Sequence, residues 1–226
     1  MKKILASVAA VILPAIATSA SAQAVMNDDS FPWRFGIQLG FNAPTFSESQ
    51  YSQTIGWNFG ATVLYDLQDF IPNSYGRISA LYTRKGTAAG LDVVDNVNGQ
   101  KYEFEDLTSY LHYLELPIHF GYAYEATDMM CLIAETGPYF AMRLSGSLRT
   151  DATRVDGKIE NPTNGDMKDY YRSLRRFDAG WGGRAGVLLD KKYELTIGYD
   201  WGLGNVINKH TGCNLNLSFN VNVYFD

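Results

Sequence analysis

Near its C-terminus the chain reads Asn214-Leu-Asn-Leu-Ser-Phe-Asn-Val-Asn-Val-Tyr-Phe225. Polar and apolar side chains alternate here without a break. A period of two places successive side chains on opposite faces of a β-strand. One face would carry only Leu, Phe and Val, and the other only Asn, Ser and Tyr. The stretch therefore predicts a strand with one fully apolar face and one polar face.

The same alternation recurs in seven earlier segments, at about 33–42, 56–67, 77–83, 114–124, 130–145, 177–189 and 193–202. None of the eight segments has a charged residue on its apolar face. The polar faces hold many glycines and these charged residues: Arg34, Asp66, Arg77, Glu115, Glu135, Arg143, Asp178, Arg184, Glu194 and Asp200. An even number of such strands is typical of bacterial membrane barrels.

The side on which charge and glycine gather indicates which face of the barrel is inside. In a membrane barrel the apolar face meets lipid and the polar face lines the lumen. The lumen of an eight-stranded barrel is just wide enough for side chains, and glycine relieves crowding there. We therefore predict an all-β, eight-stranded antiparallel up-and-down transmembrane β-barrel with a side-chain-filled lumen. The alternative is a secreted lipocalin-like or sandwich domain with its apolar face turned inward.

Composition excludes several other classes. The formal net charge of −5 disfavours a general nucleic-acid binder, so we expect no nucleic-acid partner. Two cysteines cannot form a disulfide scaffold, and no Cys/His spacing of a zinc site occurs, so we predict no metal and no cofactor. Cys131 would begin its strand at the periplasmic end and Cys213 at the extracellular end, too far apart for a disulfide, which predicts two free thiols.

Residues 1–24 have the pattern of a signal peptide. Lys2 and Lys3 precede a short apolar run, and small residues at 20–24 fit cleavage after Ala22 or Ala24. We expect residues 25–226 to form a single outer-membrane β-barrel domain. With the N-terminus in the periplasm, the long connections, about 43–55, 84–109, 146–175 and 203–212, would face outward, and the short ones, about 68–74, 125–129 and 190–191, inward.

Two of the outward connections contain hairpin signals. Asn98-Gly99 and Asp156-Gly157 are both favoured in tight turns between antiparallel strands. The connection at 146–175 also mixes acids with several arginines. That mixture is typical of a solvated face, and a patch that meets lipopolysaccharide phosphates is the functional alternative.

Four short motifs occur in order along the chain: Tyr113-Leu-Glu-Leu-Pro-Ile118, Gly137-Pro-Tyr139, Phe177-Asp-Ala-Gly180 and Tyr199-Asp-Trp-Gly-Leu-Gly-Asn205. In this order and spacing they resemble the PorT-like outer-membrane β-barrel family of Bacteroidetes. The resemblance implies an eight-stranded barrel and, for most members, no assigned activity. PorT itself is linked to type IX secretion, but a shared fold does not by itself transfer that role.

The charged residues of the polar faces are the candidate site. We expect a lumen charge network of Glu115, His119, Glu135 and Arg184, and a second cluster at the periplasmic end of the lumen, made of Arg34, Asp66, Arg77 and Glu194. Isolated charges in a narrow lumen are costly, so these groups should pair and plug the barrel. A proton-linked or catalytic carboxylate pair is the alternative reading.

Catalysis has weak support in the sequence. Ser109, His112 and Glu115 are the nearest grouping of nucleophile, base and acid, but His112 and Glu115 have opposite parity and would face opposite sides of the wall. We therefore expect no enzyme and no catalytic residues. The predicted function is a non-enzymatic structural or interaction protein with extracellular loops. Its expected partners are outer-membrane lipid, lipopolysaccharide and a periplasmic or membrane protein, and a link to secretion or surface adhesion is the wider hypothesis. The alternatives are a narrow channel for small solutes and a lipid-modifying enzyme.

Overall fold

The structure is a computed structural model that describes residues 32–46, 52–89, 93–97, 100–105, 107–149, 152–155, 158–160, 175–205 and 213–225. The predicted signal peptide and both predicted turn dipeptides, Asn98-Gly99 and Asp156-Gly157, lie outside these ranges. Within them, no helix is long and apolar enough to cross a membrane.

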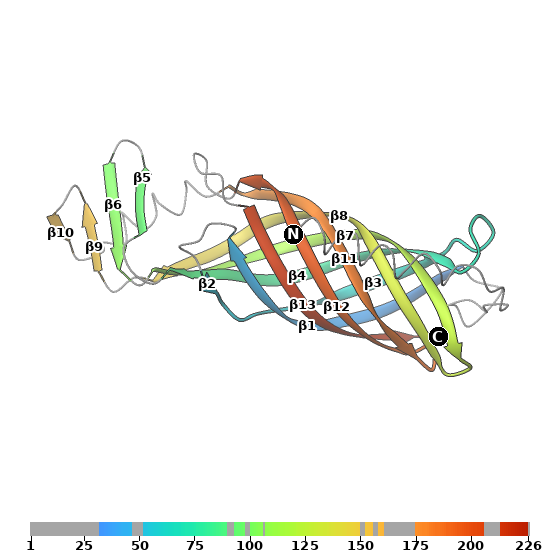
Figure 1. The fold of residues 1–226 in the computed structure, drawn as a ribbon. Helices are drawn as coiled ribbons and strands as arrows, with labels where there is room; N and C mark the ends of the chain where they lie inside the picture. The colour runs from blue at the N-terminus through green and yellow to red at the C-terminus, as the bar shows by residue number, and fades with distance from the viewer. Residues whose placement is uncertain are drawn as a thin grey trace, which may run out of the picture.

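Eight long strands form a closed antiparallel barrel (Figure 1). They are β1 (Trp33–Phe46), β3 (Gly56–Asp66), β4 (Ser74–Ala89), β7 (Leu107–Thr127), β8 (Met130–Arg149), β11 (Phe177–Leu189), β12 (Tyr193–Asn205) and β13 (Cys213–Phe225). Each strand pairs with the next along the chain, and β1 pairs with β13 to close the ring. The predicted fold class is confirmed.

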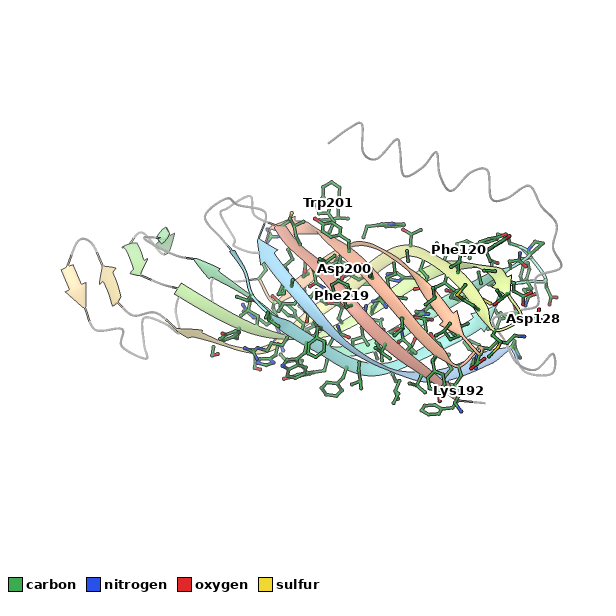
Figure 2. All side chains as sticks on the ribbon, turned by 60° about the horizontal axis from the view of Figure 1, so that its bottom comes forward. Phe120, Asp128, Lys192, Asp200, Trp201 and Phe219 are labelled. Atoms are coloured by element: carbon green, nitrogen blue, oxygen red, sulfur yellow. The ribbon has the colours of Figure 1, made fainter. Side chains whose placement is uncertain are left out.

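The polar faces line the inside of this barrel and the apolar faces lie outside. Gln38 is 1% exposed and Asn222 is 0% exposed, whereas Leu39 is 60% and Phe41 is 70% exposed. Figure 2 shows Trp201 projecting away from the barrel. The alternative with an apolar interior is therefore wrong, because this barrel buries amides and charges and exposes leucine, phenylalanine and tryptophan.

The two ends of the barrel differ in their connections. At one end, which we call the short-turn end, the strands are joined by residues 67–73, 128–129 and 190–192. Asp190 and Lys191 have φ angles of 49° and 52°, as a type I′ hairpin turn requires. Figure 2 shows Asp128 and Lys192 together at this end. In outer-membrane barrels the short turns face the periplasm, so the other, long-connection end faces outward.

The strands β4, β7 and β8 extend furthest beyond their predicted ends, toward the long-connection end. β4 continues to Ala89, where it pairs with Leu107 of β7, and Thr108 of β7 pairs with Arg149 of β8. Parts of the predicted loops 84–109 and 146–175 are therefore strand, and the predicted loops 43–55 and 203–212 likewise begin with strand residues up to Phe46 and Asn205, which corrects the prediction. An antiparallel ladder satisfies backbone groups outside the membrane as well as inside it, and it needs no apolar face there.

A second, four-stranded sheet joins the two longest connections. Its order is β10 (Lys158–Glu160), β9 (Ala152–Val155), β6 (Gln100–Glu105) and β5 (Val93–Val97). Both predicted hairpins are confirmed as strand pairs, β5–β6 and β9–β10. The pairing of β6 with β9, which links one hairpin to the other, was not predicted. The short strand β2 (Ser52–Gln53) pairs with β4 near its outer end. Figure 1 shows the second sheet beyond the long-connection end.

Candidate functional site: the lumen network

An arginine–glutamate pair crosses the lumen near the short-turn end. Nη1 of Arg77, on β4, donates to Oε1 of Glu194, on β12, at 2.9 Å, and Nη2 contacts the second carboxylate oxygen. β4 and β12 are four strands apart in either direction around the ring, so the pair joins opposite walls. Both residues are 1% exposed. A paired, two-point contact of this kind fixes geometry as well as charge.

Further polar groups hold both carboxylates that surround Arg77. Glu135 Oε1, on β8, lies 2.8 Å from Arg77 Nη2 and accepts a hydrogen bond from the Tyr75 hydroxyl at 2.6 Å. Glu194 also accepts from Asn222 Nδ2 at 2.7 Å and from the Tyr224 hydroxyl at 2.8 Å. These contacts make Arg77 the centre of a network that ties β4, β8, β12 and β13 together.

The structure groups the predicted charged residues differently from the sequence analysis. Arg77 joins Glu135 of the predicted lumen network to Glu194 of the predicted periplasmic cluster, so the two groups form one assembly. The Arg34 guanidinium lies 5.1 Å from the centroid of the Tyr224 ring, at the edge of the same assembly. Asp66 lies apart, because it accepts from the backbone and side-chain nitrogens of Gln68, at 2.8 and 2.9 Å.

A layer of amides fills the middle of the lumen. Arg184 Nη1 donates to Gln38 Oε1 at 3.2 Å, and Gln38 Nε2 donates to Asn58 at 2.9 Å and to Asn220 at 3.2 Å. Arg184 is also the cross-strand partner of Glu135 in the β11–β8 register. This layer connects β11, β1, β3 and β13, and Gln38 has no counterpart in the predicted site.

His119 is the cross-strand partner of Arg77 and lies close to Glu135. Its Nδ1 lies 3.6 Å from Glu135 Oε2, and neither ring nitrogen has a hydrogen-bond partner among the described residues. The imidazole is 2% exposed. The structure thus brings His119, Glu135 and Arg184 close to one another but leaves Glu115 outside this group.

Glu115 instead forms an ion pair with Lys85, nearer the long-connection end. The Lys85 ammonium also lies 4.8 Å from the Tyr139 ring centroid and 5.8 Å from that of Tyr113. Sequence reasoning missed Lys85 because it ended the strand at Thr83. The alternation of Thr83, Lys85 and Thr87 was the signal that could have extended the strand and placed Lys85 in the lumen.

Three tyrosines lie across glycines on neighbouring strands inside the barrel. The cross-strand pairs are Tyr75–Gly121, Tyr139–Gly180 and Tyr224–Gly36. A Cβ atom on Gly121 would stand 2.3 Å from the Tyr75 ring, so only glycine fits beneath it. Each hydroxyl then reaches a carboxylate, and the acceptors are Glu135, Asp178 and Glu194.

The arrangement suits a sealed, charge-compensated lumen. The described residues contain no group of three or more His, Cys, Asp or Glu side chains placed to hold a metal ion. His112 lies outside the barrel, where its Nδ1 is 3.0 Å from the Tyr82 hydroxyl, and Glu115 is buried inside. The wall therefore separates the base and acid of the suggested catalytic grouping. Neither Cys131 nor Cys213 forms a disulfide, as predicted.

Comparisons with known proteins place the chain in a family and find several solved barrels of similar fold. A family model described as "Outer membrane protein beta-barrel domain" matches residues 21–208. No curated protein matches the chain significantly.

Among solved structures, the chain is similar to Neisserial surface protein A, with 15% identity and a TM-score of 0.43 over 84% of this chain and 97% of that one. It is also similar to OprG of Pseudomonas aeruginosa, with 9% identity and a TM-score of 0.44 over 85% of this chain and 95% of that one. It is similar as well to Ail, the attachment invasion locus protein of Yersinia pestis, with 11% identity and a TM-score of 0.40 over 86% of this chain and 100% of that one.

Proposed function

The chain belongs to the outer membrane protein β-barrel domain family and resides in the cell outer membrane, and from this premise we propose that it works as a non-enzymatic interaction protein. In this proposal the barrel is an anchor, and the second sheet is the surface that meets a protein partner. The observation that carries the proposal is the β6–β9 pairing, which combines two separate connections into one sheet outside the barrel.

The filled lumen supports an anchor rather than a channel. The Arg77–Glu194 pair joins opposite walls, and the amides of Gln38, Asn58 and Asn220 bond to one another in the layer above. Passage of a solute through a lumen of this width would require several of these bonds to break. A narrow channel for small solutes is the rival function. Single-channel recording in a planar bilayer separates the two, because the anchor should be electrically silent.

The edges of the second sheet support a protein partner. Among the described residues, β5 and β10 each pair with only one neighbour. An unpaired edge presents a row of backbone donors and acceptors to which an extended segment of another chain can add as a further strand. A sheet held outside the membrane by the extended β4–β7–β8 strands is well placed for such an addition.

Crosslinking on intact host cells tests the interaction role. A photoreactive amino acid would be placed in β5 or β10 of the full-length protein, and the same label at position 70, in a short turn, would be the matched control. A discrete adduct to another protein is expected from the labels in β5 and β10 and not from position 70. Heat-modifiable migration in SDS would show that each labelled barrel still folds. No adduct from β5 or β10, or the same adduct from position 70, would contradict the proposal.

The finer assignment to PorT-like barrels, and with it a link to secretion or adhesion, is part of this proposal. It is supported by the motif at 113–118, whose Glu115 is the lumen partner of Lys85. Deletion of the gene should then change the set of proteins found in the medium or on the cell surface, without changing the lipid A mass spectrum. A changed acyl pattern of lipid A would instead favour the lipid-modifying enzyme.

A further inference from the structure

A polar, aromatic patch lies on the outer wall of the barrel near the long-connection end. It consists of Trp57 on β3, Tyr82 and Arg84 on β4, and Tyr110 and His112 on β7, and we call it the Arg84 patch. Trp57 and His112 are the two cross-strand partners of Arg84. These strands are neighbours in the ring, so the patch is continuous across them.

Arg84 is unusual among the outward-facing side chains. Among the side chains that the structure describes on the outer face of the barrel strands, it is the one with a charge. No described carboxylate lies within ion-pair distance of it. Its guanidinium lies 4.0 Å from the centroid of the Tyr110 ring. This stacking orients the planar group and leaves its N–H edges available for an anion.

The rest of the patch surrounds Arg84 with aromatic rings and further polar atoms. The Tyr82 hydroxyl and His112 Nδ1 are 3.0 Å apart. The Trp57 ring centroid lies 5.6 Å from that of Tyr82 and 6.4 Å from that of His112. Hydroxyl, imidazole and indole groups of this kind are typical of the membrane–water boundary, where one end of the side chain is apolar and the other is wet.

The position along the strands places the patch at the outer boundary of the membrane. Trp57 is near the long-connection end of β3, and Tyr65 is near its short-turn end, 4.5 Å from Trp33 between ring centroids. The outward residues between Trp57 and Tyr65 are apolar, and a span of this length matches the hydrocarbon core. Arg84 is level with Trp57, so its charge lies where outer-leaflet headgroups begin.

An apolar groove lies beside the patch and extends around the wall over β7, β8 and β11. It has a volume of about 610 Å³ and is lined on its outward side by Leu114, Leu116, Phe140, Met142 and Phe177. Leu114 is the cross-strand partner of Tyr82, so the groove begins beside the Arg84 patch. Arg175 also lines the groove. The wall therefore offers a cation at headgroup level next to a hollow that suits an acyl chain.

We propose that the Arg84 patch binds the phosphorylated, acylated glycolipid of the outer leaflet, the lipid A part of lipopolysaccharide. A phosphate accepts hydrogen bonds from Arg84, and an acyl chain occupies the groove beside it. Charge complementarity selects this occupant, because the outward cation Arg84 lies at headgroup level, where the anions that are themselves anchored in the membrane are lipid phosphates. The site depends on the outer-membrane location and not on the interaction role proposed above.

Binding of defined lipids to the detergent-folded full-length protein tests this site. Native mass spectrometry would compare diphosphoryl lipid A with the same lipid after removal of both phosphates. Arg84→Gln removes the charge and keeps most of the side-chain length. Arg84→Lys keeps the charge but lacks the paired N–H donors of the planar guanidinium. Lys191→Gln, in a short turn at the opposite end, is the matched control for loss of a cation.

The expected result is that Arg84→Gln weakens diphosphoryl lipid A binding at least tenfold, that Arg84→Lys weakens it less, and that Lys191→Gln leaves it unchanged. Binding of the dephosphorylated lipid should not respond to Arg84→Gln. Equal affinity of wild type and Arg84→Gln for diphosphoryl lipid A, with both proteins heat-modifiable in SDS, would overturn the proposal. Displacement of the lipid by millimolar inorganic phosphate would also overturn it, because the site would then recognise free phosphate.

Discussion

Replacement of Arg77 by methionine is the sharpest test of the lumen network. The side chain lies between Glu135 and Glu194 and contacts both carboxylates, and it is 1% exposed. Methionine has a similar length and leaves little empty space. The variant therefore removes the charge and its hydrogen bonds while it largely preserves the packing.

The expected loss follows from the charges that remain. Without Arg77, the buried carboxylates of Glu135 on β8 and Glu194 on β12, which are two strands apart, lose the cation that they share, and Arg184 is the cross-strand neighbour of Glu135. Removal of one member of a buried ion pair typically costs about 3–5 kcal/mol, because the other member stays buried without compensation. We expect Arg77→Met to lower the free energy of unfolding by that amount. The double variant Arg77→Met/Glu194→Gln should lose about 1–2 kcal/mol less, because one stranded charge is gone.

Urea unfolding in detergent micelles, followed by tryptophan fluorescence and by heat-modifiable migration in SDS, measures these differences. Arg184→Met is the first control, since among the described residues Arg184 donates to the neutral amide of Gln38, and the variant should cost less than Arg77→Met. Arg149→Ala, at the outer end of β8, is the second and should be close to neutral. The reasoning would be refuted if Arg77→Met unfolded at the same urea concentration as Arg149→Ala, or if the double variant were the less stable of the two.

Three further predictions test other parts of the barrel. Gly121→Ala should lower stability by more than about 1 kcal/mol, because the added Cβ would stand 2.3 Å from the Tyr75 ring. Gly183→Ala should be nearly neutral, because its Cβ would stand 3.6 Å from the nearest atom. Equal urea midpoints of the two variants would contradict this. Phe219→Arg places a charge on the lipid face at mid-strand and should cost about 2–4 kcal/mol in vesicles, so an unchanged unfolding free energy would mean that this face does not meet lipid. In the folded protein a maleimide should modify Cys213 faster than Cys131, which is 4% exposed, and after denaturation without reductant it should modify both; two unreactive thiols would indicate a disulfide.

The alternation of side chains made the barrel readable from the sequence. In strands such as 56–66 and 213–225 each residue's face follows from its parity alone, so the closed barrel, the buried polar face and the apolar exterior were all predicted. The same parity separated His112 from Glu115 correctly. Strand ends were less accurate, because beyond the membrane no lipid imposes an apolar face. For this reason the predicted strand ended at Thr83. The prediction therefore missed Lys85, which faces the lumen, and Arg84, which lies on the outer wall.

Contacts across the barrel were decided by the tertiary structure. Their position in the alternating pattern shows that Arg77, Glu135 and Glu194 face inward. Which of them are in contact depends on strand order, register and shear, which place β4 opposite β12. The tyrosine–glycine pairs and the joining of two connections through β6 and β9 depend on the same long-range geometry. The sequence by itself determined what faces lipid and what faces the lumen, because that choice is local. Only the closed fold determined the partners, because they come from residues far apart in the chain.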